Sequence, residues 1–241
     1  MGIKAITFDF WSTLFKDTGD IGKNRHVWRI ENMAKGLAKA GWMGSPAEIL
    51  AAIEVASNRG TEIRLRGDVD FLPEDQIELI FKHLAVSPNK EVFAEVLSAY
   101  TKAAGEFPPA PMSGTIETVK KLANKYPIGL ISNTGITPGS VLRTVLEGAG
   151  ILDCFKVLTF SNEVNLVKPN PEIFKLTAAS LGVDVKDTVH IGDDFEADVV
   201  GAQGVGAKGI WLNPKEDSKQ GKAFAVIKEL PELLEILGRN G

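Results

Sequence analysis

Polar and charged residues follow several short apolar runs of this sequence, and their types can do chemistry. Asp9 ends the first run, Ser132 ends a second, the pair Asp193-Asp194 follows a third, and Lys168 lies soon after a fourth. In open α/β sheets, ligands and catalytic groups sit at the carboxyl ends of the strands. We therefore expect a carboxylate, a hydroxyl and an ammonium to meet at one sheet edge. Any one of them taken alone is also compatible with a helix cap or a turn.

The elements that must position these residues alternate along the chain. Residues 5–8 are apolar, β-branched and aromatic without helical spacing, which predicts a buried strand. Further strands are predicted at 128–131, 157–160, 189–191 and 210–212, and helices at about 113–125, 137–150, 171–182, 196–203 and 231–237. Strands that alternate with helices predict a parallel, doubly wound sheet and therefore an α/β fold.

A long segment between the first strand and this alternating part shows only helical spacing. After a predicted loop at 14–22, amphipathic helices are expected around Val27–Gly41 and from the starts Ser45-Pro46, Pro73 and Ser87-Pro88. Four such helices in succession predict a small bundle. The proline-rich residues 107–111 favour an extended connector back to the sheet. We expect an α/β core of residues 1–16 and 108–241, with residues 17–107 as an inserted helical domain.

Composition excludes several classes of protein. A hydrophobic fraction of 44% and a charged fraction of 24% are typical of a globular protein. The formal net charge of -4 argues against nucleic acid or an anionic membrane as the main partner. The single Cys154 excludes an intramolecular disulfide and is compatible with a reducing cytoplasm. No signal peptide or membrane-spanning run is apparent. The oligomeric state is left open by the sequence.

The ordered set Asp9, Ser132, Lys168 and Asp193-Asp194 resembles the four motifs of the haloacid dehalogenase-like hydrolase superfamily. The resemblance spans nearly the whole chain. It implies a Rossmann-like core with a helical cap inserted between the first and second motifs, and hydrolysis through a covalent intermediate on Asp9. It also implies direct contact of a metal ion with Asp9, the backbone carbonyl of Trp11, and Asp193, while Asp194 and Asp198 hold metal-bound waters or pair with Lys168.

Charge considerations support a metal ion at this edge. Four carboxylates, those of Asp9, Asp193, Asp194 and Asp198, would meet the single ammonium of Lys168. Like charges held close together are unfavourable unless a cation joins them or some of them take up protons. Mg²⁺ with oxygen ligands is the simplest remedy where phosphate is the substrate. Helix capping is the alternative interpretation, and it suits Asp194 better than Asp193.

The remaining residues suit the binding and transfer of a phosphoryl group. An ionised Asp9 needs no base to attack phosphorus, and aspartyl-phosphate is a recognised intermediate. Lys168 can neutralise charge on Asp9 and on the phosphoryl oxygens. Ser132 can donate its hydroxyl to a phosphoryl oxygen, with the Asn133 amide beside it. The backbone amides of Phe10 and Trp11 can complete the cradle.

One position departs from the phosphatases that the chain resembles. Two residues after the nucleophile they carry a second aspartate as general acid and base, and this chain has Trp11. General acid–base help is worth about 10²–10⁴-fold in rate. A packing role is the simplest interpretation of the indole. The candidate replacement acids are Asp17, Asp20 and His26, each of which is otherwise an ordinary surface residue. Substrates with good leaving groups, such as aryl or acyl phosphates, are the other solution.

Two related activities also lack that second aspartate. The 2-haloacid dehalogenases carry an aromatic residue there, use no metal, and lose the paired acidic pattern that this chain keeps. Phosphonatases use a cap lysine that is not recognisable here. We therefore predict a Mg²⁺-dependent phosphatase for a small phosphorylated metabolite, with 2-haloacid dehalogenation as the alternative and a non-catalytic binding protein as a second alternative. Arg25 and Arg29 are expected on a solvated helix face, with the binding of a substrate anion as the other possibility.

Overall fold

The chain divides into two compact units in the computed structural model, which describes residues 2–66, 69–218 and 221–238. The sheet unit comprises residues 1–16, 110–133 and 146–241, and the helical unit comprises residues 17–109 and 134–145. The prediction from sequence placed 134–145 with the sheet, so the observed units differ from it in that segment.

The sheet unit is built on six strands that all run parallel. Their order is β5 (Phe155–Phe160), β4 (Ile128–Ser132), β1 (Ala5–Phe8), β6 (Thr188–Gly192), β7 (Lys208–Leu212) and β8 (Ala225–Ile227). Every residue of β1, β4 and β6 is buried, as expected for central parallel strands covered on both faces. The predicted doubly wound α/β fold is confirmed. The edge strand β8 was not predicted.

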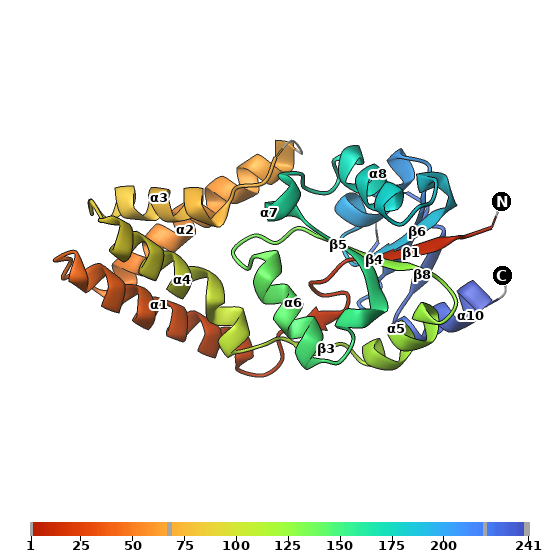
Figure 1. Cartoon of the computed structure of the whole chain (residues 1–241), viewed down its shortest axis with the longest axis horizontal. Coiled ribbons are helices and arrows are strands. Elements are labelled where there is room, and N and C mark those ends of the chain that lie inside the picture. Colours follow the sequence, from red (N-terminus) through yellow and green to blue (C-terminus); the bar gives the residue numbers. More distant parts are fainter. Residues whose placement is uncertain (1, 67–68, 219–220, 239–241) are drawn as a thin grey trace. The chain divides into compact units, whose positions relative to one another are not determined.

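Helices cover both faces of this sheet, with α5 and α10 on one side and α8 on the other (Figure 1). The helices after the four-helix segment are α5 (Thr115–Ala123), α6 (Gly139–Gly148), α7 (Ser161–Val164), α8 (Pro171–Ser180), α9 (Gly201–Gly204) and α10 (Leu233–Gly238), and residues 139–145 of α6 belong to the helical unit. The helix predicted at 196–203 is instead a π-helical segment, Phe195–Val200, followed by α9. Such π-helical turns are frequent near functional sites.

A two-stranded antiparallel ribbon marks the place where the chain leaves the sheet unit and returns to it. Its strands are β2 (Phe15–Lys16) and β3 (Ala110–Pro111). β2 falls within the stretch predicted as a loop at 14–22, and α1 begins before that stretch ends. The proline-rich connector is extended, as predicted, because proline cannot continue a helix.

The helical unit contains α1 (Ile21–Lys39), α2 (Pro46–Arg66), α3 (Pro73–His83) and α4 (Lys90–Glu106). Glu48 reaches back to the backbone N–H of Ser45, 2.7 Å away, as the Ser-Pro-x-Glu pattern predicts. The predicted start at Ser87-Pro88 is wrong. Helix α4 begins at Lys90 because the Asn89 side chain accepts the N–H of Val92 and caps it.

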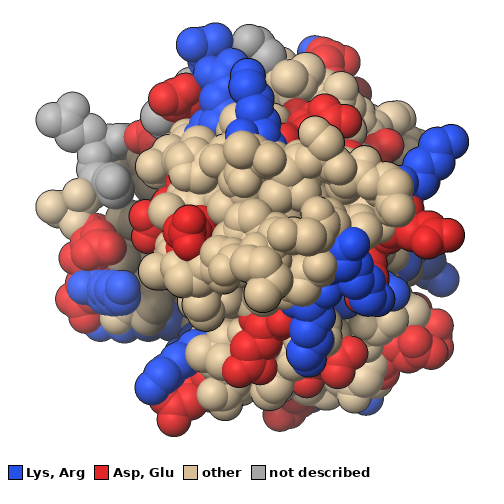
Figure 2. Space-filling model, turned by 90° about the vertical axis from the view of Figure 1, so that its left-hand side faces the viewer, with Lys and Arg blue, Asp and Glu red and all other residues tan. Residues whose placement is uncertain are grey.

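Apolar side chains from all four helices form one core in the helical unit. Its fully buried members include Met33, Leu37, Ile49, Ile77, Ile80, Val96 and Tyr100. On the face shown in Figure 2, basic and acidic side chains surround an area of mostly uncharged residues, and neither charge sign dominates. Within the described residues, no helix is both long enough and apolar enough to cross a membrane.

Candidate active site

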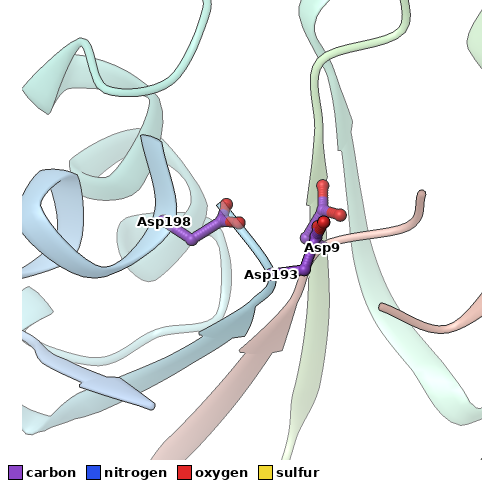
Figure 3. Close-up of side chains that lie close together, drawn as sticks. All are labelled: Asp9, Asp193 and Asp198. Atoms are coloured by element: carbon purple, nitrogen blue, oxygen red, sulfur yellow. The ribbon is translucent and has the colours of Figure 1, made fainter. Parts of the chain in front are cut away.

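Three carboxylates gather at the carboxyl edge of the sheet. Asp9 follows β1, Asp193 follows β6, and Asp198 comes from the π-helical segment, with carboxylate oxygens all within 4.8 Å of one another (Figure 3). β1 and β6 are neighbours in the sheet, and the backbone N–H of Asp9 donates to the carbonyl of Ile191 over 2.9 Å. Parallel pairing therefore places the ends of both strands, and the acids that follow them, side by side.

Lys168 links two of these carboxylates. Its Nζ lies 2.7 Å from Oδ1 of Asp9 and 2.6 Å from Oδ1 of Asp198, and its side chain is buried. The backbone of Lys168 is itself held at both polar atoms, since the Asn133 side chain accepts its N–H at 2.8 Å and donates to its carbonyl at 3.0 Å. The backbone of Lys168 is thus held in place, and its ammonium group forms ion pairs with two carboxylates.

The two residues at the end of β4 have different environments. Ser132 is fully buried, and within the described residues its Oγ has no hydrogen-bond partner. A buried hydroxyl without a partner is unfavourable by about 1–3 kcal/mol, so it calls for an explanation such as an absent ligand. The Asn133 side chain is occupied by the Lys168 backbone. A contribution of Asn133 to phosphate binding would therefore have to come from its backbone N–H.

Asp194 does not belong to this group of three acids and caps the π-helical segment. Its Oδ1 accepts the backbone N–H groups of Glu196 and Ala197, each at 3.0 Å, and the residue is exposed. This is the capping alternative considered for it, and it does not support the prediction of Asp194 as a metal ligand. Its backbone N–H donates to Oδ2 of Asp198 at 3.0 Å.

Gly192 makes the approach of Asp198 possible. A Cβ at Gly192 would overlap the carboxylate of Asp198, so only glycine allows this carboxylate to lie against the end of β6. The order Gly192-Asp193 is thus explained by packing as well as by chemistry.

Burial and a single shared cation determine the charge state of the site. Burial raises the pKa of Asp9 to about 7, although Lys168 opposes the shift, and burial together with Asp198 raises the pKa of Asp193 to about 6. Burial also disfavours ionised Asp198, but Lys168 and His190 outweigh it and hold the pKa of Asp198 below its usual range. For Lys168, burial is outweighed by Asp198 and Asp9, which raise its pKa.

This donor set fits a divalent metal ion. Asp9, Asp193 and Asp198 offer oxygen atoms only, which suits a hard cation such as Mg²⁺. Burial is the main cause of the raised pKa values of Asp9 and Asp193, and the neighbouring carboxylate of Asp198 adds to it, so the ionised forms of both acids are disfavoured beside a single lysine. A cation would restore the balance.

The residues after Asp9 provide backbone and packing but no acid. The Phe10 ring is fully buried and stacks on Phe15 with ring centroids 4.8 Å apart. Trp11 is half-buried and packs edge-on against Phe10 at 5.1 Å. Its indole cannot exchange a proton with a leaving group. The hydroxyl of Thr13 donates to Oδ1 of Asp193 over 3.3 Å.

The sequence analysis did not identify two residues that contact the site, His190 and Trp211. His190 is buried in β6, with its Nε2 3.1 Å from Oδ1 of Asp198 and its Nδ1 2.9 Å from the hydroxyl of Thr7. The indole of Trp211 donates to the carbonyl of Asp193 at 2.9 Å. A histidine inside an apolar strand pattern was the signal that could have identified the first of these.

The two arginines that were expected on a solvated face of the first helix of the helical unit lie in the interior. Arg25 and Arg29 are buried rather than solvated. Arg25 pairs with Asp17 at 2.8 Å and donates to the carbonyl of Phe107, while Nε of Arg29 donates to the carbonyl of Tyr100 at 2.8 Å. Burial, followed by the proximity of Arg25, lowers the pKa of Arg29. Asp17, Asp20 and His26, considered as replacement acids, all belong to the helical unit.

The comparison with known protein families decides the class of this site. Residues 3–206 match the model of the haloacid dehalogenase-like hydrolases. The chain belongs to this family. It is accordingly a hydrolase.

Phosphatases are among the relatives of this hydrolase, and a dehalogenase is among the structures that share its fold. A glyceraldehyde 3-phosphate phosphatase from Pyrococcus furiosus is 26% identical over 99% of this chain and 94% of its own length. A phosphatase structure from Thermococcus onnurineus is 26% identical with a TM-score of 0.64, covering 98% of each chain. The structure of a 2-haloacid dehalogenase from Pseudomonas syringae has a TM-score of 0.76 at 23% identity, covering 98% of this chain and 99% of its own. This last likeness concerns the fold.

Proposed function

We propose that this hydrolase is a Mg²⁺-dependent phosphatase that acts on a small phosphorylated metabolite. The observation that carries the proposal is the group of three carboxylates around Lys168. An enzyme that attacks carbon without a metal has no use for this excess of acids, whereas a phosphate-transfer site needs cations to gather the negative oxygens. The phosphatase relatives that align over nearly the whole chain support the same class.

Each residue of the group has a definite task in this proposal. Asp9 attacks phosphorus, the bond from phosphorus to the substrate's leaving oxygen breaks, and water then hydrolyses the resulting aspartyl-phosphate to free phosphate and Asp9. Lys168 neutralises charge on Asp9 and on the phosphoryl oxygens. The hydroxyl of Ser132, which has no hydrogen-bond partner among the described residues, donates to one of these oxygens. Mg²⁺ would be held by Asp9, Asp193 and the backbone carbonyl of Trp11, and when bound it supplies further positive charge to the transferring group.

Asp198 acts mainly as the anion that holds Lys168. Its Oδ1 accepts from Lys168 and from His190, and its Oδ2 accepts from the backbone of Asp194. A carboxylate has about four lone-pair sites, so three of them are already used. Asp198 therefore has at most one position to offer to a metal ion or to a water bound to it.

The indole at position 11 restricts the substrate. Without an acid there, the leaving oxygen must depart with little protonation, which favours aryl and acyl phosphates over alkyl phosphates. The Trp11→Asp variant should hydrolyse alkyl phosphates faster than the parent, by up to about 10²-fold. An unchanged rate in a variant that remains folded would show that another residue supplies the proton.

A phosphate-release screen with and without Mg²⁺ tests the proposal. The panel should contain glyceraldehyde 3-phosphate, since a relative is named for it, together with aryl, acyl and alkyl phosphates. We expect release that a chelator abolishes and that the Asp9→Asn variant lacks. Release that persists with a chelator would refute the proposal.

2-Haloacid dehalogenation is the second candidate, and the aromatic residue at position 11 is the observation that favours it. Halide release from chloro- and bromo-acids without added metal would establish it. The non-catalytic alternative is set aside, because the chain belongs to a hydrolase family and its candidate nucleophile and lysine lie in direct contact.

A further inference from the structure

A buried polar chain lies directly beneath the candidate site and runs through His190. In the register of β1 and β6, Thr7 is the partner of His190, and Phe174 of α8 packs perpendicular to the imidazole at a centroid distance of 5.3 Å. Both Thr7 and His190 are buried. Among the hydrogen bonds of the described residues, the one between His190 and Asp198 links this pair to the three-carboxylate group.

The hydrogen bonds that link Thr7, His190 and Asp198 all run in one direction from donor to acceptor. Oδ1 of Asp198 accepts a hydrogen bond from Lys168 and is ionised, so it cannot donate to the imidazole. The proton on the ring must therefore sit on Nε2, 3.1 Å from Asp198. Nδ1 is then an acceptor, and the Thr7 hydroxyl, 2.9 Å away, is the group that donates to it; the carbonyl of Val189, at 3.4 Å, is the more distant acceptor for the same hydroxyl proton.

We propose that His190 is a positioning residue that fixes the carboxylate of Asp198, and through it the ammonium of Lys168, in line with Asp9. The hydrogen bond from Nε2 occupies one side of Oδ1 of Asp198 and leaves the other side for Lys168. Thr7 fixes the ring tautomer from the opposite end. This arrangement parallels the way in which hydrogen bonds behind a ligating or catalytic side chain set its orientation.

A purely structural histidine would not explain this arrangement. A core position between two strands is filled at least as well by an apolar residue, and an imidazole buried there requires partners at both nitrogens. Both partners are present, and one of them is the carboxylate that holds Lys168. Burial lowers the pKa of His190, in keeping with a neutral ring that donates through one nitrogen only.

Two amide substitutions at His190 distinguish the role of Nε2 from that of Nδ1. The amide nitrogen of His190→Gln overlays Nε2 and keeps a donor toward Asp198, whereas that of His190→Asn overlays Nδ1 and loses it. We expect the Gln variant to keep kcat within a few-fold of the parent and the Asn variant to lose about 10–100-fold, the range typical of residues that orient a catalytic side chain. KM should change little in either variant. Equal kcat values for the two variants, whether high or low, would overturn the proposal.

The tautomer is tested by NMR of the intact ¹⁵N-labelled chain near neutral pH, independently of turnover. We expect His190 to show a protonated Nε2 and an unprotonated Nδ1. The reverse pattern, or a doubly protonated ring, would overturn the proposal. Because the kinetic test rests on the proposed phosphatase function, a parent protein without phosphatase activity but with this tautomer would refute that function and leave the positioning geometry in place.

A matched pair of threonine variants controls for loss of a buried hydroxyl. Thr7→Val removes the donor to Nδ1, while Thr159→Val removes a hydroxyl that is paired over 2.8 Å with Thr177 elsewhere in the same unit. Both threonines are buried. We expect lower kcat in the first variant and an unchanged kcat in the second. A decrease of similar size in both would mean that the effect comes from the fold alone, and the proposal would fail.

Discussion

Replacing Lys168 by methionine should destabilise the protein strongly and in a pH-dependent manner. The substitution keeps most of the side-chain volume but removes the ammonium that lies 2.7 Å from Asp9 and 2.6 Å from Asp198. Removing one partner from a buried ion pair typically costs about 3–5 kcal/mol, because the remaining charge is left without compensation. Two carboxylates lose their cation here, so we expect a loss near the upper end of that range.

The pH dependence follows from the protonation of Asp9. Its pKa is already raised to about 7 by burial, and Lys168 is the group that opposes the shift. Without the lysine, Asp9 takes up a proton more readily. The variant can therefore relieve its excess negative charge in mild acid, and the loss of stability should be larger near pH 8 than near pH 5. Bound Mg²⁺ should recover part of the loss near pH 8.

Urea denaturation of the parent and of the Lys168→Met variant at both pH values measures this effect. Lys4→Met is the matched control, since Lys4 also lies 2.7 Å from an aspartate, Asp187, but its side chain is 64% exposed. Exposed pairs contribute about 0–1 kcal/mol. A Lys168→Met variant as stable as the Lys4→Met variant near pH 8, or one that loses more near pH 5, would refute the electrostatic description of the site.

Three further predictions follow from the geometry of the same sheet edge. Gly192→Ala should abolish turnover, because the new Cβ overlaps the carboxylate of Asp198 and forces it off the lysine; steady-state kinetics with a melting curve will show whether a folded, active variant contradicts this. Ser132→Ala should raise stability by about 1 kcal/mol, since it removes a buried hydroxyl without a partner, yet lower phosphate release by about 10²-fold. Without metal, stability should fall as pH rises from about 4 to 7, because folded Asp9 retains a proton that the unfolded chain has released; thermal melts of the Asp9→Asn variant should show a shallower slope.

The architecture of the sheet was predictable because it depends on local signals that repeat. Short apolar runs with β-branched residues gave β1, β4 and β6, and the end of each run identified a site residue. The strand β8 (Ala225–Ile227) was not predicted because three residues are too few to show a periodic pattern of apolar side chains. The start of α4 was misplaced because Asn89 competes with Ser87-Pro88 as a cap, and only the folded backbone decides between them.

The contacts within the site were less predictable, because they depend on partners distant in sequence. Asn133 was predicted beside the phosphate, but its side chain holds the backbone of Lys168. The link from Thr7 to His190 requires the register of two strands that are separated by most of the chain. Arg29 was expected in solvent because arginine is rarely buried, and its carbonyl partner on another helix has no signature in the sequence.

The ribbon of Phe15–Lys16 and Ala110–Pro111 has an evolutionary consequence. The outgoing and returning segments pair with each other, so the roughly ninety residues between them form a loop whose two ends are held together at the edge of the sheet unit. Lengthening a closed loop adds little entropic cost, about 0.6 kcal/mol for each doubling. A different helical or mixed insert can therefore be grafted at this base without redesigning the strands that carry Asp9.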